Sequence, residues 1–203
     1  MIITKIYKWQ RLLLDGVIAA NPGLGLDIRA EGFVKIFENH IPNRSRILDI
    51  GGGWGFYDQP LRQRGHQVAV LDVVTPGYAR APVILYDGER FPFADDRFET
   101  SLLITVLHHV KDPAAVVREA RRVTRHCIII VEDLYHHALG RLWTILRDRI
   151  YNFELLGHPC RFKKKSEWIQ FLNNLDLRLV TEKEVYTWLA GMRILNGVFV
   201  LET

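Results

Sequence analysis

The chain has 203 residues, of which 48% are hydrophobic and 25% are charged, and its formal net charge at pH 7 is +4. This material suffices for one sizeable core, argues against two large domains, and contains no apolar stretch near the roughly 20 residues that span a bilayer. The positive charge is spread along the chain except for a basic stretch between Arg141 and Lys165. We therefore expect no nucleic-acid partner and no stable membrane insertion.

The two cysteines, Cys127 and Cys160, stand far apart and belong to no disulfide or zinc spacing. This usage indicates a reducing, cytoplasmic setting. The N-terminal apolar run follows several basic residues, but Asp15 and Gly16 divide it into pieces too short for the apolar region of a signal peptide. We therefore expect no export signal there.

The first part of the chain is predicted to be helical. Phe33, Ile36, Phe37 and His40 recur at intervals of three and four, which predicts a helix over Ala30–Ile41. A turn is expected at residues 21–25, which include Pro22 and two glycines. Residues 1–42 would thus form an N-terminal helical extension of a single domain that spans residues 1–203.

From Arg46 onward, short apolar runs alternate with amphipathic segments, which is typical of a parallel sheet with crossover helices. The sequence predicts helices over Asp58–Arg64 and from Asp112-Pro113 onward. The predicted strands are Arg46–Ile50, Gln67–Asp72, Val83–Tyr86, Thr100–Thr105 and Cys127–Glu132. The expected fold is therefore α/β, a doubly wound Rossmann-like sheet that is mostly parallel, with helices on both faces and residues 46–133 as its nucleotide-binding core.

The remainder is predicted to contain two helices and a closing pair of strands. Helices are expected over Ala138–Ile150 and over Ser166–Leu175, the second with Ser166 as its N-cap. Strands are expected over Arg178–Tyr186 and Ile194–Leu201. Residues 134–175 would then form the substrate side of the domain, and residues 176–203 would close the sheet.

A glycine-rich turn follows the first predicted strand. Gly51, Gly53 and Gly55 stand at alternate positions, where the absence of side chains lets the backbone turn sharply and a ligand approach it closely. The third glycine of the dinucleotide fingerprint is replaced by Phe56, and the chain has no Tyr-x-x-x-Lys. At the end of the second strand, Asp72 can accept both hydroxyls of a ribose. These features predict a nucleoside ligand and argue against hydride transfer.

Several further motifs occur in a fixed order: Asp87–Glu99 (DGERFPFADDRFE), Leu102–Val110 (LLITVLHHV), Asp112-Pro113 and Arg118–Val123 (REARRV). Together with the glycine turn, they resemble the S-adenosylmethionine-dependent methyltransferases that include ubiquinone and menaquinone biosynthesis enzymes. The resemblance covers about Arg46 to Asp133. It implies S-adenosyl-L-methionine as the cofactor and methyl transfer to a small-molecule acceptor as the activity, with an antiparallel strand at the C-terminal edge of the sheet.

The resemblance also implies which residues bind the cofactor. The methionine end would lie against Asp49 and the turn of Gly51, Gly53 and Gly55. The rest of the predicted set comprises Asp72 and Val73 at the ribose, Asp87 and Gly88 at the adenine, and Thr105 and Val106 beside the sulfonium. Two positions depart from the family pattern: Thr124–Cys127 replaces a Lys-Pro-Gly-Gly turn, and the bulky Trp54 stands inside the glycine turn, where it either alters the pocket or points outward.

Methyl transfer from a sulfonium is an in-line displacement, so positioning can supply about 7 to 11 kcal/mol and a general base is optional. Candidate bases follow the fourth and fifth strands, at the edge where such sheets bind ligands: His108, His109 and His136, with Tyr135 and His137 beside them. Candidate substrate residues are Trp143, Tyr151 and His158. We expect no metal; a site built from Glu132, Asp133, His136 and His137 is the alternative.

Two further alternatives stay open at this point. The apolar positions of residues 138–153 recur with helical spacing among arginines. This pattern indicates either core packing with a solvated basic face or a surface that receives an apolar or anionic acceptor. The second alternative includes peripheral association with a membrane. As to function, the alternatives are a cofactor-binding protein with little activity, a macromolecular methyltransferase and an NAD-dependent oxidoreductase.

Overall fold

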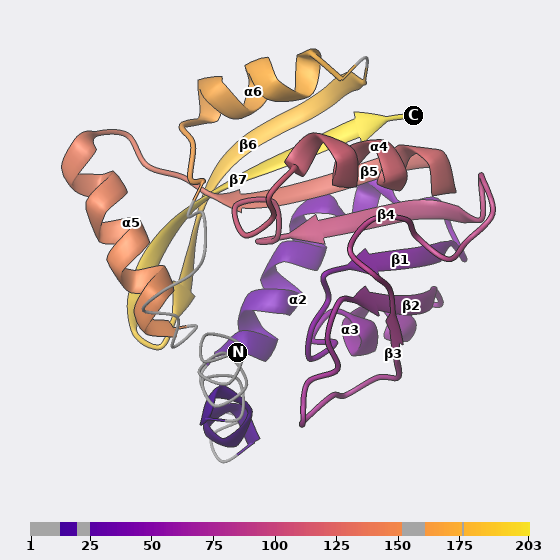
Figure 1. Ribbon diagram of the computed structural model, residues 1–203, viewed down its shortest axis with the longest axis horizontal. Helices are drawn as coiled ribbons and strands as arrows, with labels where there is room; N and C mark the ends of the chain where they lie inside the picture. Colours follow the sequence, from indigo (N-terminus) through magenta and orange to yellow (C-terminus); the bar gives the residue numbers. More distant parts are fainter. Residues whose placement is uncertain (1–12, 20–24, 152–160, 176) are drawn as a thin grey trace.

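The computed structural model describes residues 13–19, 25–151, 161–175 and 177–203. Its frame is a seven-stranded sheet with the strand order β3-β2-β1-β4-β5-β7-β6 (Figure 1). The first five strands in that order run parallel, and β7 pairs antiparallel with both β5 and β6. The doubly wound, mostly parallel sheet with an antiparallel C-terminal edge is therefore confirmed.

The strands fall close to their predicted positions, and the first two match at both ends. They are β1 (Arg46–Ile50), β2 (Gln67–Asp72), β3 (Val83–Leu85), β4 (Phe98–Ile104), β5 (Thr124–Asp133), β6 (Arg178–Leu189) and β7 (Met192–Glu202). The helices are α2 (Leu26–Phe37), α3 (Asp58–Gln63), α4 (Pro113–Val123), α5 (Ala138–Tyr151) and α6 (Lys165–Asn173), with helical residues 13–19 before them and a 3-10 turn over Glu38–His40. None of the helices in these described ranges has the length and hydropathy that a membrane span requires.

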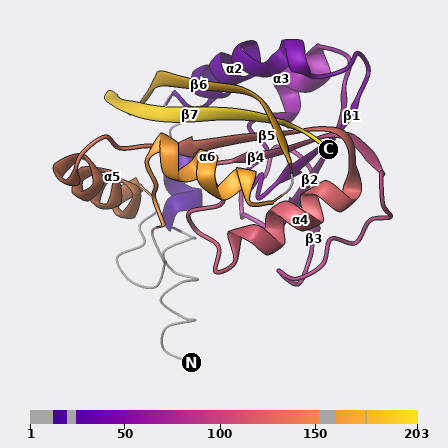
Figure 2. The same cartoon turned by 90° about the horizontal axis from the view of Figure 1, so that it is seen from above.

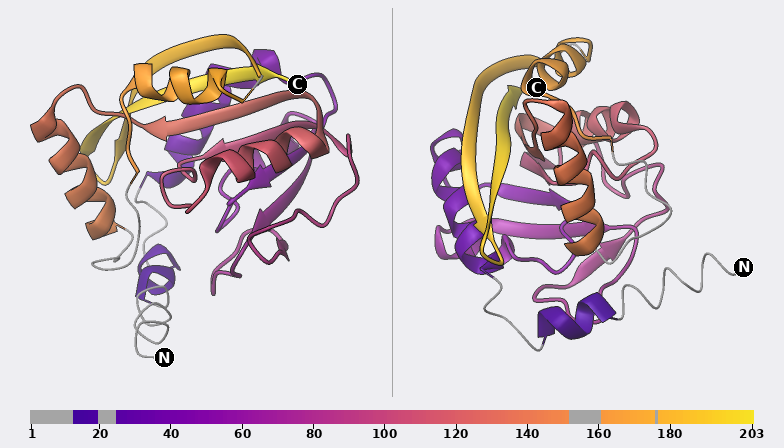
Figure 3. Two further views of the ribbon diagram at one scale, coloured as in Figure 1. Left: turned by 45° about the horizontal axis from the view of Figure 1, so that its top comes forward. Right: turned by 90° about the vertical axis from the view of Figure 1, so that its left-hand side faces the viewer.

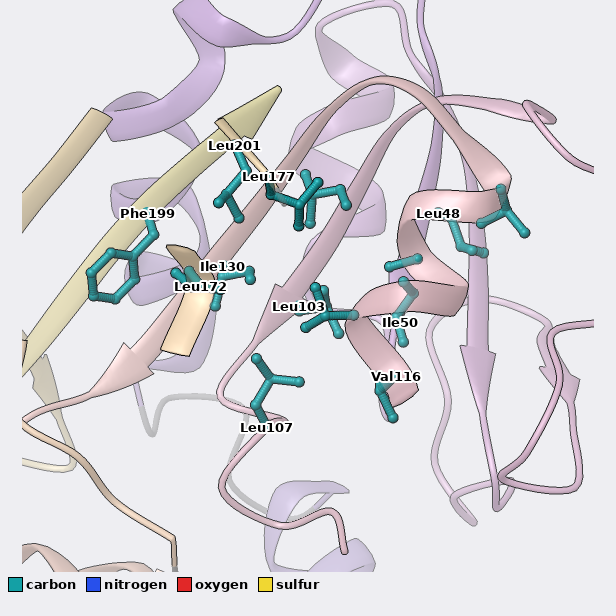
Figure 4. Packing of buried hydrophobic residues seen from close by; sticks show 14 of the residues in the cluster. Leu48, Ile50, Leu103, Leu107, Val116, Ile130, Leu172, Leu177, Phe199 and Leu201 are labelled. Atoms are coloured by element: carbon teal, nitrogen blue, oxygen red, sulfur yellow. The ribbon is translucent and has the colours of Figure 1, made fainter. Parts of the chain in front are cut away.

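Helices cover both faces of the sheet, as predicted (Figure 2). On one face, α2 and α3 bury a cluster that includes Phe33, Phe37 and Leu61 against β1, β4 and β5. On the other face, α4 and α6 pack against the cluster drawn in Figure 4, where Leu103 and Ile130 of the sheet meet Val116 of α4 and Leu172 of α6. The central strands are buried on both sides, which explains their nearly continuous apolar runs.

Two predicted helix boundaries are wrong. The helix expected over Ala30–Ile41 already begins at Leu26, where the Arg29 N–H donates to the Gly25 carbonyl, and it tightens into the 3-10 turn after Phe37. The second helix is capped by Lys164 instead of Ser166, because the Glu167 carboxylate accepts the Lys164 N–H at 2.6 Å. Both errors have the same origin: the first turn of each helix carries no buried apolar position that periodicity could detect.

The β6–β7 hairpin is longer than predicted, because it continues past the end of β5. Pairing between β5 and β7 stops at Asp133 and Asn196, whereas β6 and β7 remain paired to Leu189 and Met192. Figure 3 shows this projecting hairpin on one side and α5 standing across the end of the sheet. The hairpin tip and α5 therefore extend the molecule beyond the sheet, at the edge where the carboxyl ends of the parallel strands meet.

Helix α5 turns its apolar face outward. Its buried residues are Thr144, Arg147 and Asp148. Its exposed large side chains are Leu139, Leu142, Trp143, Leu146 and Ile150, which are 49–78% exposed. Core packing of this stripe, one of the two readings of the sequence, is therefore wrong.

Candidate functional site

A cavity of about 400 Å³ opens at the carboxyl ends of β1, β2 and β4. This edge is where open α/β sheets bind ligands, and the volume lies in the range of small-molecule sites. The lining comes from six parts of the chain: the helical residues Leu14 and Ile18, α2 (Leu26, Arg29), the glycine turn (Asp49, Gly51–Gly53, Trp54), the ends of β2 and β4 (Asp72, Val73, Ile104–Val106), α5 (Arg147, Asp148, Tyr151) and the β6–β7 hairpin (Leu189, Ala190, Ile194).

The glycine turn has the sharp backbone that its sequence predicts. Gly51, Gly53 and Gly55 all have positive φ, between 52° and 75°. A Cβ on Gly51 would lie 2.6 Å from a methyl group of Val106, and a Cβ on Gly52 would lie 2.4 Å from a carboxylate oxygen of Asp49. The turn thus brings bare backbone against the walls of the cavity, where any side chain would fill the space.

Asp49 lines the cavity and is almost completely buried. Burial, together with the charges of Asp72 and Asp58, raises the pKa of this carboxyl to about 8. Its Oδ2 has no hydrogen-bond partner within the described part of the chain. A buried acceptor of this kind matches a cationic or hydrogen-bond-donating group of a ligand.

Asp72 stabilises the turn from the neighbouring strand. Its carboxylate accepts the Gly53 N–H at 3.0 Å and the Val74 N–H at 3.2 Å, and both Asp72 and Val73 line the cavity. Asp87 and Gly88 are not among the lining residues. The exposed Asp87 accepts the N–H groups of the two residues after Gly88, which holds the pKa of its carboxyl below the ordinary range. Contact between Asp87 or Gly88 and adenine stays a prediction.

Trp54 lies in the wall of the cavity, which favours the alternative in which this side chain affects the pocket. Its indole N–H donates to Asp15 at 2.7 Å, and the other oxygen of Asp15 accepts the Gly77 N–H at 2.7 Å. Asp15 therefore connects the helical residues 13–19 to the glycine turn and to the loop after β2. Sequence reasoning treated Asp15 only as an interruption of an apolar run.

The loop after β4 is fixed by one buried carboxylate. Glu132 accepts the N–H groups of Val106 and Leu107 at 3.0 and 2.6 Å, and its second oxygen lies 2.5 Å from Nδ1 of His108. Thr105 has a φ of 56°, which is strained for a non-glycine residue, and its N–H donates to the Val131 carbonyl. Thr105 and Val106 thus border the cavity, where the resemblance places the sulfonium.

His108 and His109 both line the cavity, and their rings are 4.0 Å apart. Burial lowers the pKa of His108, but the carboxylates of Glu132 and Asp148 more than offset this and raise it to about 10. This raised pKa opposes the predicted role of His108 as a general base, because a base needs a pKa near neutrality. Oδ1 of Asp148 lies 3.6 Å from Nε2 of His108 and 3.8 Å from Nε2 of His109.

The three residues after β5 that were predicted as candidate bases lie outside the cavity lining. His136 is largely exposed and lies 3.7 Å from Glu184, His137 accepts the Gly140 N–H, and the Tyr135 hydroxyl donates to Glu167. The alternative metal site is not assembled either. Glu132 holds the β4 loop, and Asp133 pairs with Arg147, Arg29 and Asn196.

Of the predicted substrate residues, Tyr151 lines the cavity and its hydroxyl donates to the Leu189 carbonyl at 3.1 Å. Trp143 lies on the exposed face of α5, and His158 lies outside the described residues. The structure adds Arg29, Arg147 and Asp148, which sequence reasoning missed. The signal for Arg147 and Asp148 was a polar stripe on α5, but the amphipathic pattern alone does not reveal which stripe faces the protein.

Residues 48–129 match the family model described as a methyltransferase domain. A demethylmenaquinone methyltransferase of Streptomyces griseus is 29% identical over 126 residues, which are 56% of this chain and 54% of that protein. An uncharacterized protein of Methanocaldococcus jannaschii is 30% identical over 93 residues, 45% of each chain. The chain thus spans about half the length of these relatives.

Solved structures show the same fold over nearly the whole chain. A putative methyltransferase of Haloferax volcanii, in complex with the Trm112 methyltransferase activator, has a TM-score of 0.69 at 14% identity and covers 93% of this chain and 96% of its own. A Thermotoga maritima protein described as a methyltransferase, with possible histamine N-methyltransferase activity, has a TM-score of 0.68 at 16% identity over 93% and 97%. Taken together, the family match and the shared fold show that residues 48–129 form a methyltransferase domain of the class I S-adenosylmethionine-dependent type.

Proposed function

We propose that the chain transfers the methyl group of S-adenosyl-L-methionine to a small-molecule acceptor, which binds between the β4 loop and α5. One observation carries this proposal: a single cavity runs from the glycine turn to the polar face of α5. A nucleoside at the turn and an acceptor beside α5 would therefore meet without solvent between them. The family relationship supports the cofactor, and the cavity volume of about 400 Å³ favours a small acceptor over a macromolecule.

The residues of the cofactor half fit the group. The unpartnered Oδ2 of Asp49 suits the ammonium of the methionine end, and the bare backbone of Gly51–Gly53 in the cavity wall suits its close approach. Each oxygen of Asp72 accepts one backbone N–H and keeps a second lone pair for a ribose hydroxyl. When bound, the cofactor supplies a methyl group on a sulfonium, which is an excellent leaving group.

The protein would contribute mainly by positioning. The carboxylate of Glu132 fixes the backbone of Val106 and Leu107, so the wall beside the sulfonium is rigid. Helix α5 and the hairpin tip close the opposite side through Tyr151 and Leu189. Holding two reactants in line in this way can supply about 7 to 11 kcal/mol, so methyl transfer does not depend on a dedicated base.

The test begins with the cofactor and proceeds to the acceptor. Calorimetry should give a Kd for S-adenosylmethionine that rises at least tenfold in Gly51→Ala, because the new methyl group would collide with Val106. Gly65→Ala is the matched control: it also replaces a glycine of positive φ, but nothing lies within 4 Å of the added atom.

Incubation of cell extract with enzyme and methyl-labelled cofactor should then label a low-mass species. Label found only in RNA or protein would contradict the small-molecule acceptor, and no label at all would favour a cofactor-binding protein with little activity.

We also propose that the exposed face of α5 contacts an anionic lipid surface. Five large apolar side chains form one stripe there, and the exposed charges of the helix are the cations Arg141 and Arg149. An apolar stripe flanked by cations is the pattern of helices that lie in the interface of a membrane. The same helix lines the cavity through Arg147, Asp148 and Tyr151, so lipid binding of its stripe would bring the cavity close to the surface that supplies an apolar acceptor.

Vesicle flotation tests this contact. The protein should float with phosphatidylcholine vesicles that contain phosphatidylglycerol, float less with pure phosphatidylcholine, and lose association when Leu142 and Leu146 are both replaced by Asp. Ile28→Asp is the control, since Ile28 is 80% exposed on α2. The proposal fails if the protein does not associate with the anionic vesicles at low salt. It also fails if the protein forms a dimer that dissociates when Leu142 and Leu146 are both replaced by Asp.

A reducing, cytoplasmic compartment remains our expectation for the chain, and it is consistent with the buried free thiol of Cys127.

A further inference from the structure

A second feature of the cavity lies at the end opposite the glycine turn. His108 and His109 from the β4 loop meet Asp148 from α5, and one ligand atom from each residue lies within 4.8 Å of the other two. His108 and Asp148 are buried, and all three residues line the cavity. Two imidazoles and a carboxylate at this spacing form the donor set that binds divalent transition ions with open coordination positions.

A second, independent observation points to a ligand. Nε2 of His108 is buried and has no hydrogen-bond partner in the described ranges, and the nearest carboxylate oxygen, Oδ1 of Asp148, lies 3.6 Å away. The same oxygen lies 3.8 Å from Nε2 of His109. With bonds of about 2.0 to 2.2 Å to zinc, neighbouring ligand atoms are roughly 3.3 to 3.5 Å apart. The two distances to Asp148 therefore need to shorten by only a few tenths of an ångström, whereas the ligand atoms of the cluster as a whole, which lie within 4.8 Å of one another, need a side-chain shift of about 1 Å.

The surroundings of His108 also match those of a metal ligand. Its Nδ1 lies 2.5 Å from Glu132, and the same carboxylate is held by the N–H groups of Val106 and Leu107. Metal-binding histidines almost always donate their other ring N–H to a carboxylate or carbonyl, which fixes the tautomer and the ring orientation. On the other side, Phe162 stacks on the His108 ring at 4.4 Å. The ring is therefore held with Nε2 directed at Asp148.

We propose that His108, His109 and Asp148 bind one divalent transition ion, such as Zn²⁺, at the acceptor end of the cavity. This site replaces both the expectation of no metal and the alternative built on Glu132, Asp133, His136 and His137. The ion keeps open positions toward the cavity, where an oxygen of the acceptor completes its coordination and loses its proton more readily. That last step rests on the proposed methyl transfer; the metal site itself does not.

The test uses the full chain purified without a histidine tag, stripped with a chelator and titrated with Zn²⁺ alone. Calorimetry should give one ion per chain with a micromolar or lower Kd, and Co²⁺ should compete. His108→Gln and Asp148→Asn should each weaken binding by at least tenfold. His136→Gln and Asp95→Asn are the matched controls, because these residues are exposed and lie outside the cavity. His108 is also a partner of the buried Glu132, so His108→Gln can fail to fold. His109→Gln, which leaves that contact intact, is therefore a third variant and should also weaken zinc binding.

Two outcomes would overturn the proposal: no stoichiometric binding, or binding that Asp148→Asn and His109→Gln leave unchanged. S-adenosylmethionine binding is measured on the same stripped protein. If the wild-type chain binds S-adenosylmethionine but not Zn²⁺, the metal site alone is refuted. If it does not bind S-adenosylmethionine, the proposed function is refuted.

Discussion

At the scale of single residues, Asp49 has the clearest link between burial and pH. The folded chain holds its carboxyl neutral up to a pKa of about 8, whereas the unfolded chain ionises it near 3.8. Because the raised pKa means that the folded state binds the extra proton, the contribution of Asp49 to stability is complete below about pH 4 and is lost as the pH rises toward 8. We expect urea midpoints to fall over this range and Asp49→Asn to flatten the fall. An equally steep fall in the variant would contradict this prediction.

Asp15 is the residue whose role the sequence concealed. Its two oxygens hold the indole of Trp54 and the backbone of Gly77, so residues 13–19 cover the cavity next to the glycine turn. We expect Asp15→Ala to raise the Kd for S-adenosylmethionine about 5- to 30-fold, as the loss of one or two charged hydrogen bonds implies, with little change in the apo melting temperature. Asp95→Ala, which removes an exposed partner of Arg122, is the control. If Asp15→Ala and Asp95→Ala bind S-adenosylmethionine with equal affinity, residues 13–19 do not contribute to its binding site.

At the scale of elements, β1 and β4 are joined at their starts by a charged contact. Glu99 accepts the backbone N–H of Arg46 at 2.7 Å and two hydrogen bonds from its guanidinium, which lower the pKa of Glu99 to about 2. A lowered pKa stabilises the fold above the unfolded value near 4.5, and this stability is lost as the pH falls toward 2. We expect Glu99→Gln to cost about 1–2 kcal/mol at pH 7 and less than half as much at pH 2.5, measured by urea unfolding. If the substitution lowers the free energy of unfolding equally at both pH values, the charge of Glu99 does not contribute to stability.

The elements also show how far sequence could lead. Buried parallel strands such as β1 and β2 have continuous apolar runs bounded by polar turns, so their ends were predicted correctly. The residues predicted to bind the cofactor at the glycine turn and after β2 follow these strands directly, and for the same reason most of them line the cavity. The acceptor half was not, because Arg147 and Asp148 reach the cavity only when α5 turns its polar stripe inward. An amphipathic pattern gives the two faces of a helix but not which of them meets the protein.

At the scale of the whole molecule, the cavity connects elements that are distant in the chain. Its lining comes from residues 13–19, the glycine turn, the β4 loop, α5 and the β6–β7 hairpin. A ligand that fills this cavity contacts all of them only in the folded state, so its binding must stabilise the fold as a unit.

This coupling leads to a prediction for the intact chain. At a concentration 100 times its Kd, S-adenosylmethionine should add about 2.7 kcal/mol to the free energy of unfolding, which for a domain of this size raises Tm by roughly 5–10 °C. The shift should grow with the logarithm of the ligand concentration, and methionine alone should give less, because it lacks the nucleoside. Gly51→Ala should abolish most of the shift, while Gly65→Ala keeps it. Differential scanning calorimetry measures all of these quantities, and a shift that NAD produces as well as S-adenosylmethionine would contradict the assignment of the cavity.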